Sequence, residues 1–192
     1  MYRLLRYLKT TAALGLVFRG SSEPSAKHVE LGPCFADSDW AGDVDSRKST
    51  SGMAIKINGT VVQYRSKMQS IVAHSSAEAE YVSLSDASKA ILAKRSLMSD
   101  MGLAQKKPTL LYGDNEASLV LSNSESTSRR TRHIDVRFHF IRECVKPRDE
   151  SSPQTGSINL QWIPTADQEA DIFTNALGKI PFQLLRDRLM GI

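Results

Sequence analysis

The chain has 192 residues, and its 25 lysine and arginine residues against 21 aspartate and glutamate residues give a net charge of +4. A hydrophobic content of 41% and a charged content of 24% are typical of a globular domain and exclude disordered and fibrous proteins. The two cysteines, Cys34 and Cys144, are too few for a disulfide framework or a thiolate zinc site. The longest apolar run falls far short of the roughly 20 residues that span a bilayer, so we expect no membrane partner.

Positive charge is concentrated in two segments. Residues 129–148 contain seven basic residues against two acidic ones, and residues 1–20 contain four basic residues and no acidic one. The rest of the chain is therefore acidic. Separate basic segments on an acidic body are typical of a protein that holds a polyanion at chosen places. The nucleic-acid-binding residues that we predict are Arg129, Arg130, Arg132 and Arg137.

Residues 1–20 are basic and leucine-rich, as a mitochondrial presequence would be. Leu4, Leu5 and Leu8 also have helical spacing, which favours a surface helix over a cleaved signal. Residues 21–33, rich in serine, proline and glycine, are predicted to be a linker to one α/β domain at 34–192. Without a secretion signal, and with so few cysteines, we expect a cytoplasmic or nuclear location.

The predicted domain begins with three strands and a long helix. A short apolar segment runs from Cys34 to Asp39, and strands at 53–57 and 60–64 are joined by Asn58-Gly59, a strong hairpin signal. A helical pattern then begins at Ser75 or Ser76 and ends before Gly102. The later elements are expected as a strand at 109–112, helices at 116–121 and 137–145, a strand at 158–163, a helix from the capping-box pair Thr165 and Gln168 to Gly178, and a last helix at 180–189.

This order predicts a mixed sheet. Strands joined through helices pair in parallel, whereas the Asn-Gly hairpin makes the first part antiparallel. In such sheets, ligands bind beyond the carboxyl ends of the strands. Chemistry is therefore to be sought among the polar residues that follow the strands.

Four acidic residues stand out, although each has a simpler interpretation. Asp37 ends the first strand, on the same face as Phe35 and Asp39, and a turn-forming role is its alternative. Glu80 continues the apolar stripe of the long helix, so burial requires a partner for its charge. Asp114 follows a strand and would cap the next helix. Asp171 lies too far inside its predicted helix to be a cap, and a solvated surface acid is the alternative there.

Taken together, the four positions indicate a metal site. Carboxylates that converge repel one another unless divalent cations lie between them, and oxygen ligands suit Mg²⁺ or Mn²⁺. Two ions roughly 4 Å apart can activate water and stabilise the leaving oxygen at a phosphodiester. Spacing along the chain leaves open whether the acids converge.

Five strings carry a resemblance to a known family. They are ADSDWAGDVDSRKSTSG from Ala36, INGTVVQYRSKMQSIVAHSSAEAEY from Ile57, LYGDNEASL from Leu111, RTRHIDVRFHFIRE from Arg130 and IPTADQEADIFTNAL from Ile163. In this order they resemble the ribonuclease H domain of copia-type retrotransposon Pol polyproteins. The first residues resemble the helix that ends the reverse transcriptase connection region before this domain.

The resemblance implies a ribonuclease H-like fold with a mixed five-stranded sheet. It also implies hydrolysis of the RNA strand of an RNA:DNA hybrid with two Mg²⁺ ions, with Mn²⁺ as an alternative, and the reverse transcriptase domain of the same polyprotein as a partner. A retroelement particle is the cytoplasmic setting that it suggests. Carried over residue by residue, the catalytic and metal-binding residues are Asp37, Glu80, Asp114 and Asp171.

The chain also departs from the family. Ribonucleases H of cells carry a histidine in the loop before the last acid, and residues 162–171 contain none. Asn175 stands where a lysine is common, and His74 where a leucine is usual. A catalytically inactive domain that only binds nucleic acid or a partner, as a relic or a domesticated element, is therefore the alternative. An integrase-type transposase ranks third, since the chain has no zinc-binding module.

Overall fold

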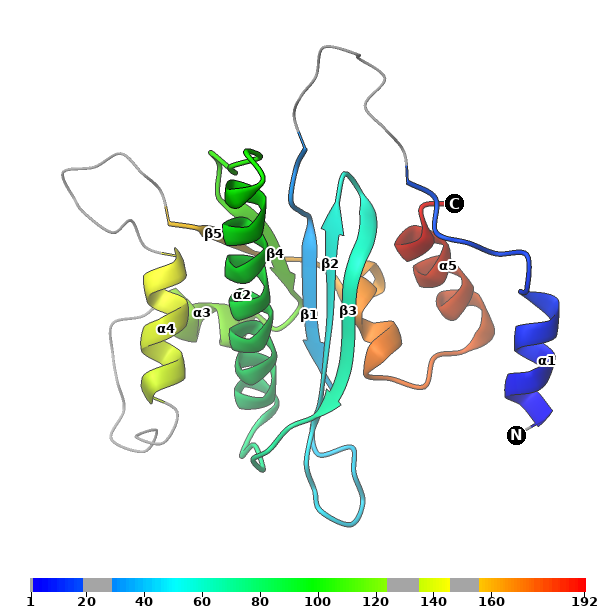
Figure 1. Ribbon diagram of the computed structural model, residues 1–192. Helices are drawn as coiled ribbons and strands as arrows, with labels where there is room; N and C mark the ends of the chain where they lie inside the picture. Colours follow the sequence, from blue (N-terminus) through cyan, green and yellow to red (C-terminus); the bar gives the residue numbers. More distant parts are fainter. Residues whose placement is uncertain (1, 19–28, 124–134, 146–155) are drawn as a thin grey trace.

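The computed structural model describes residues 2–18, 29–123, 135–145 and 156–192 (Figure 1). The sheet has the order β3-β2-β1-β4-β5, with β1 antiparallel to β2 and parallel to β4, and β4 parallel to β5. The predicted mixed five-stranded sheet is thus confirmed. Its strands are β1 (Cys34–Ser38), β2 (Thr50–Ile57), β3 (Thr60–Met68), β4 (Thr109–Gly113) and β5 (Ile158–Trp162).

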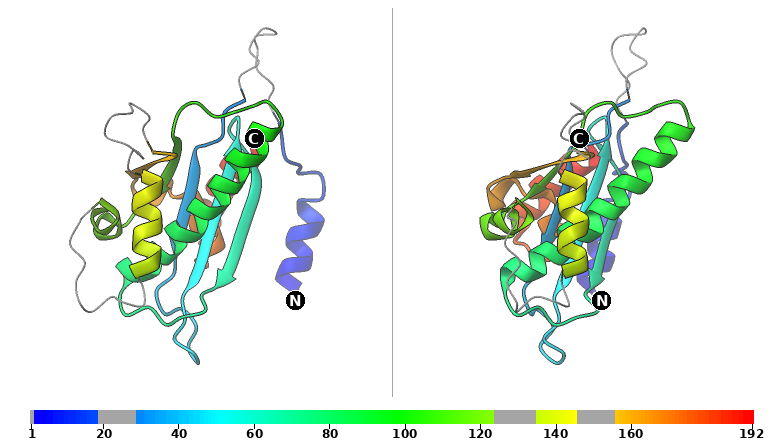
Figure 2. Two further views of the ribbon diagram at one scale, coloured as in Figure 1. Left: turned by 60° about the vertical axis from the view of Figure 1, so that its left-hand side comes forward. Right: turned by 90° about the vertical axis from the view of Figure 1, so that its left-hand side faces the viewer.

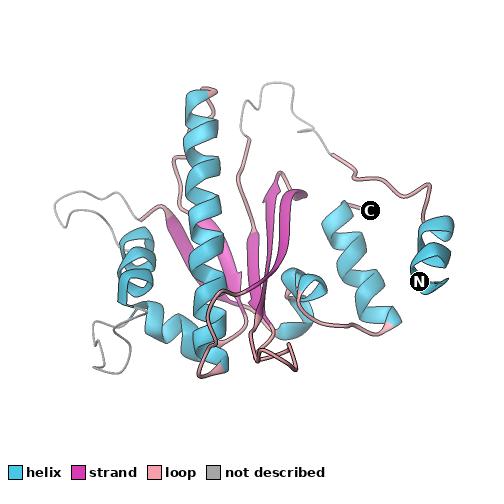
Figure 3. Ribbon diagram, turned by 60° about the horizontal axis from the view of Figure 1, so that its bottom comes forward, coloured by secondary structure: helices cyan, strands magenta, loops and turns pink. Residues whose placement is uncertain are grey.

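Helices cover both faces of the sheet. Figures 1 and 3 show the sheet between α2, α3 and α4 on one side and η2 and α5 on the other. Because β1, β4 and β5 run parallel, their carboxyl ends lie at one edge of the sheet. The helical elements are α1 (Tyr2–Thr10), α2 (Ser76–Asp100), α3 (Glu116–Asn123), η1 (Thr165–Asp167), η2 (Glu169–Phe173), α4 (Asp135–Val145) and α5 (Lys179–Met190).

Helix α2 forms where the sequence predicts it. The Ser75 hydroxyl accepts a hydrogen bond from the Glu78 amide at 3.2 Å and caps the first turn. The helix ends before Gly102, whose φ of +78° suits glycine and stops the helical run. Its apolar stripe, including Leu84 and Ile91, is buried in the larger hydrophobic core. Glu80 lies on this buried stripe, as expected.

Alternation along the strands separates two hydrophobic cores. Cys34 and Ala36 belong to the larger core under α2, whereas Phe35 belongs to a smaller core with Ala170. Successive side chains of a strand point to opposite faces, so Asp37 follows Phe35 to the side covered by η2. This arrangement places the carboxylate of Asp37 at the end of β1, on the side of the sheet that η2 covers.

The predicted helix from Thr165 to Gly178 is wrong, because two short 3₁₀ segments, η1 and η2, stand in its place. The two residues read as a capping box bond elsewhere. Thr165 Oγ1 donates to Asp114 Oδ2 at 2.7 Å, and the buried Gln168 donates from Nε2 to the carbonyl of Ala36 at 2.9 Å. These two bonds tie the segment to the rest of the domain, and Gln168 also caps η2, because its Oε1 accepts from the Ala170 amide at 3.2 Å.

Segment η2 is anchored to β2 by charge and by close packing. The buried Lys56 Nζ lies 2.7 Å from Glu169 Oε2. A Cβ at Gly52 would lie 2.7 Å from Thr174 Cγ2 and 2.9 Å from the carbonyl oxygen of Ala170, so only glycine permits this approach. The fold thus holds the irregular segment against the end of the sheet.

Helix α1 lies at the outer edge of the molecule in Figure 1 and in the left panel of Figure 2. None of its residues is buried, and the ring of Tyr7 meets Phe182 of α5 edge-on at 5.6 Å. The segment just before β1 also packs on the domain, because Leu31 is buried and forms an antiparallel β-bridge with Ile57. Among the helices in the described ranges, none has the length and hydropathy needed to cross a membrane.

Candidate metal centre

Three carboxylates from three separate elements converge at the carboxyl edge of the sheet. Asp37 lies on β1, Glu80 in the second turn of α2, and Asp114 directly after β4. One oxygen from each lies within 4.8 Å of the others. Asp37 and Glu80 are buried, with 5% and 6% of their surface exposed, and Asp114 is half-buried. The sequence picked all three residues, and the structure brings them together.

The environment of Asp37 disfavours its charge. Burial raises the pKa of Asp37 to about 6, and the nearby negative charges of Asp114 and Asp171 act in the same direction. A hydrogen bond from the Thr174 hydroxyl to Oδ2 opposes this shift, because it stabilises the charged form. The Asp37 carbonyl also accepts from Ser83 Oγ at 2.7 Å, which ties α2 to β1 at this level.

Glu80 is held by one oxygen only. Its Oε1 accepts a hydrogen bond from the Ser38 amide at 3.1 Å, and its buried Oε2 has no hydrogen-bond partner among the residues that the structure describes. Burial raises the pKa of Glu80 to about 9, with further contributions from the charges of Asp37 and Asp114. A buried carboxylate oxygen without a partner is costly. A divalent cation would remove that cost by neutralising the shared charge.

Asp114 does not cap the helix that follows it. Asn115 takes that role, since its Oδ1 accepts from the Ser118 amide at 3.1 Å. Asp114 instead accepts from Thr165 Oγ1 at 2.7 Å, and one of its carboxylate oxygens belongs to the acidic cluster. The donor set is therefore oxygen only and carries up to three negative charges, which fits Mg²⁺ or Mn²⁺.

Asp171 lies outside this group of three. It sits on η2, and its Oδ1 accepts a hydrogen bond from Nδ2 of Asn175. Its charge still contributes to the raised pKa of Asp37, so the two carboxylates belong to one electrostatic neighbourhood. The predicted fourth acid is thus near the cluster but is turned toward Asn175.

The predicted basic residues cannot be placed in the same way. Arg129, Arg130 and Arg132 lie outside the described residues, and for Arg137 the structure describes only its position on α4. Other acids near the first strand bond to the backbone or side chains in or next to their own loop. Asp39 accepts from the Thr50 amide, and the hydrogen bonds from Ser46 lower the pKa of Asp43.

Sequence reasoning missed the hydroxyl and amide groups that orient the acids. Thr174 and Thr165 each donate to one carboxylate of the cluster, and the Ser38 amide donates to another. Thr165 and Thr174 stand in one of the strings that carry the family resemblance, IPTADQEADIFTNAL, but hydroxyl residues are common in loops. Only the docking of η1 and η2 on the sheet reveals these contacts.

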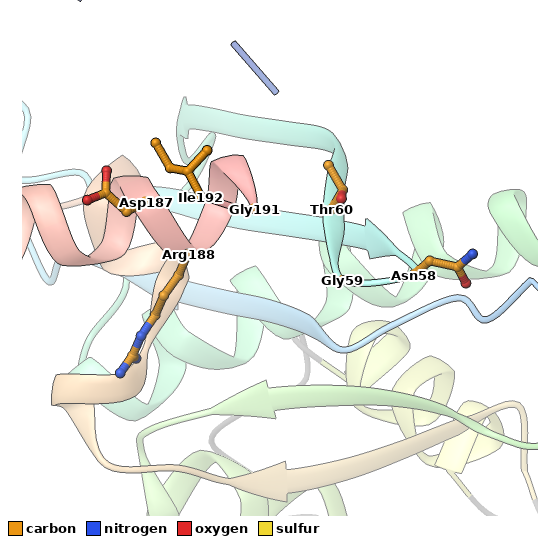
Figure 4. A pocket seen from close by; sticks show the side chains of 7 residues that line it. All are labelled: Asn58, Gly59, Thr60, Asp187, Arg188, Gly191 and Ile192. Carbon is orange, nitrogen blue, oxygen red and sulfur yellow. The ribbon is translucent and has the colours of Figure 1, made fainter. Parts of the chain in front are cut away.

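A pocket of about 270 Å³ lies elsewhere, between the β2–β3 turn and the end of α5 (Figure 4). Figure 4 shows Asn58 and Thr60 on the turn and Asp187 and Arg188 on the helix. None of the four predicted acids lines it. The chemistry of the chain is therefore to be sought at the open carboxyl edge of the sheet.

Comparisons with known proteins find relatives of the chain as a whole. No family model matches the chain. It is 34% identical over 189 residues to the retrovirus-related Pol polyprotein from transposon TNT 1-94 of Nicotiana tabacum. The matched segment covers 98% of this chain and 13% of that protein. It is 32% identical over 181 residues to the one from transposon RE1 of Arabidopsis thaliana, covering 94% of this chain and 11% of that protein. The chain thus spans a small part of these relatives.

A solved structure supports the fold. The ribonuclease H1 named LC11-RNase H1, isolated from compost, superposes with a TM-score of 0.51 at 16% sequence identity, over 76% of this chain and 91% of that one. The chain is therefore a relative of one segment of the copia-type retrotransposon Pol polyproteins, and it has the ribonuclease H fold.

Proposed function

We propose that the chain is an endoribonuclease that hydrolyses the RNA strand of RNA:DNA hybrids by two-metal-ion catalysis, as a step of retrotransposon reverse transcription. The observation that carries this proposal is the convergence of Asp37, Glu80 and Asp114 within 4.8 Å, at the carboxyl edge of a ribonuclease H fold. The relatives are Pol polyproteins, which adds support for a reverse-transcription setting.

Each residue of the site has a distinct task in this proposal. Asp37, Glu80 and Asp114 would hold the cations, with Asp171 completing the set once its carboxylate turns from Asn175. Two Mg²⁺ or Mn²⁺ ions supply a metal-activated water and stabilisation of the leaving 3′ oxygen.

The protein groups around the acids keep them in position. Ser38 and Thr174 orient the carboxylates of Glu80 and Asp37 through the hydrogen bonds described above. A 2′-hydroxyl on the strand to be cut distinguishes RNA from DNA at such a site.

The proposed partners and location follow from the same setting. The reverse transcriptase domain of the same polyprotein would help to hold the hybrid, and the arginines at 129, 130, 132 and 137 would contact its phosphates. We place this activity in a cytoplasmic retroelement particle or in the nucleus. Replacing the first three arginines by glutamine should weaken hybrid binding and flatten its dependence on salt. An unchanged salt slope would show that this segment is only a solvated face.

A cleavage assay tests the proposal. The purified chain is incubated with Mg²⁺ and a hybrid labelled on the RNA strand, beside the variants Asp37→Asn and Glu80→Gln and beside the surface control Asp86→Asn. We expect cleavage of the RNA strand by the wild type and by the control only. Cleavage by both the Asp37→Asn and the Glu80→Gln variants would contradict the metal-site assignment.

One observation favours a second candidate, a domain that binds hybrids without cutting them. Asp171 is hydrogen-bonded to Asn175 and lies outside the group of three acids. If this arrangement persists with metal present, the second ion lacks a ligand. Hybrid binding without cleavage by the wild type, in either Mg²⁺ or Mn²⁺, would favour this candidate.

A further inference from the structure

Both tryptophans of the chain lie beside the acidic cluster. Trp40 is two residues beyond the end of β1, and Trp162 is the last residue of β5. Strand β4, which leads to Asp114, lies between β1 and β5 in the sheet. The two tryptophans therefore belong to the same carboxyl edge of the sheet that carries Asp37 and Asp114.

Trp40 is fixed on the side of α2. Its Nε1 donates a hydrogen bond to the carbonyl of Ala73 at 3.2 Å, which links the loop after β1 to the loop before α2. These two loops adjoin the elements that carry Asp37 and Glu80. Even so, 55% of the tryptophan surface is exposed. The polar end of the side chain is thus anchored while much of its apolar surface stays open.

Trp162 has the same arrangement at the end of β5. Its Nε1 donates to the carbonyl of Asp114 at 3.0 Å, and 48% of its surface is exposed. This hydrogen bond joins the indole directly to the backbone of one of the three acids. Neither indole needs a further partner for its N–H group, so what each offers to a ligand is the exposed surface of its ring.

Such a pair suits a nucleic acid. A large aromatic ring held in one orientation loses little entropy on binding, and bases and sugars stack on it without regard to sequence. A cluster of acids alone would repel phosphates, but cations bound there attract them and bring the neighbouring nucleosides over the two indoles. An acidic centre with two exposed indoles at the same edge of the sheet therefore fits a phosphodiester backbone and its nucleosides.

We propose that Trp40 and Trp162 are stacking platforms that hold the nucleosides on the two sides of the scissile phosphate. This inference rests on the proposed hybrid substrate and adds the surface that positions it. The tryptophans are positioning and binding residues here, and the acids remain the ligands of the cations.

Two variants with a single tryptophan each test the proposal. Trp162→Phe keeps Trp40 as the reporting indole, and Trp40→Phe keeps Trp162. The hybrid has an RNA strand that cannot be cut, so hydrolysis does not consume it and the acids that would hold Mg²⁺ stay intact. Binding of a fluorescein-labelled RNA:DNA hybrid in Mg²⁺ is followed by anisotropy, and indole emission is followed in a parallel titration with unlabelled hybrid. We expect both indoles to be quenched along the same binding curve as the anisotropy.

Leucine variants measure the contribution of each ring. Trp40→Leu and Trp162→Leu should each weaken hybrid binding about tenfold, whereas the phenylalanine variants keep a ring and retain most of the affinity. The matched control is Tyr2→Leu, an exposed aromatic on α1 that should leave affinity unchanged. Circular dichroism confirms that each variant is folded before its affinity is compared.

The outcomes separate this inference from the proposed function. Binding by anisotropy with no change in indole emission, or with unchanged affinity in the leucine variants, overturns the stacking role and leaves the ribonuclease proposal standing. Equal losses for phenylalanine and leucine would assign the effect to the indole N–H bond and also overturn it. No hybrid binding by any form, together with no cleavage by the wild type, would remove both proposals.

Discussion

The two sides of the candidate metal centre are built differently. On one side, Asp37, Glu80 and Asp114 are set by a strand end, a helix turn and the residue after a strand, and they converge. On the other side, Asp171 lies on a short 3₁₀ segment and bonds to Asn175. Regular elements fix three of the candidate ligands by backbone geometry, whereas the fourth depends on side-chain contacts that dock an irregular segment.

This difference also affects the order in which the acids would bind cations. Burial first, and then the charges of the neighbouring acids, raise the pKa values of Asp37 and Glu80. Asp171 can reach the site only by exchanging its contact with Asn175 for a cation. We therefore expect the three acids to bind a first ion and Asp171 to matter for a second one.

The largest effect should separate the two sides by activity. Asp37→Asn removes a ligand from the group of three and should lower cleavage by roughly a thousandfold or more, since bound cations supply several kcal/mol to the transition state. Asp171→Asn should cost less, about ten- to a hundredfold, because this carboxylate lies outside that group. Rates of hybrid cleavage at saturating Mg²⁺ decide this. Equal losses for the two variants would contradict the distinction.

The next effect concerns the stability of the irregular side. Lys56→Met leaves the buried Glu169 without its ion-pair partner and should lower the free energy of unfolding by about 3–5 kcal/mol. The exposed control Asp86→Asn breaks weak surface pairs and should cost less than about 1 kcal/mol. Urea denaturation of both variants provides the comparison. Similar values for the two would show that the buried pair does not anchor η2.

A pH titration of the stability of metal-free protein should reveal the raised pKa of Glu80. Burial and neighbouring charge raise the pKa of Glu80 from 4.5 to about 9, so the folded state keeps a proton that the unfolded state has lost. The stability contributed at this position therefore falls as pH rises between about 4.5 and about 9. Glu80→Gln, which does not titrate, should gain in melting temperature relative to the wild type across this range in EDTA. A constant difference would show that Glu80 is not perturbed.

The smallest effect should come from Asn175. Asn175→Ala removes the hydrogen bond that holds Asp171, and a competing bond of about 1 kcal/mol corresponds to a few-fold change in affinity. We expect the Mg²⁺ concentration for half-maximal cleavage to fall by that factor. The control is Asn115→Ala, which removes a helix cap and leaves Asp171 untouched. An increase in the required Mg²⁺ would indicate that Asn175 supports Asp171 in its working position.

The sequence predicted the regular half of the molecule because its signals are local. The Asn58-Gly59 hairpin and the helix capped by Ser75 follow from turn chemistry and periodicity. Asp37 and Asp114 were predicted because they lie at the ends of strands, and Glu80 because it continues the apolar stripe of its helix. The strings of the family resemblance led to the same positions.

The irregular half could not be predicted in this way. The pair Thr165 and Gln168 has the pattern of a capping box, yet both side chains bond to groups far away in the chain. Close approach at Gly52 and the buried Lys56–Glu169 pair also depend on the assembled sheet. Long-range contacts of this kind leave no periodic signal, and they are what decides the position of Asp171.

Direct titration with Mn²⁺ tests the central claim that the converging acids form a metal site. Calorimetry on the wild type with a hybrid whose RNA strand cannot be cut should show two bound ions, and Asp37→Asn should lose this binding while remaining folded. Mn²⁺ binding that is equal in the wild type and in Asp37→Asn would contradict the account, as would the absence of binding to the wild type.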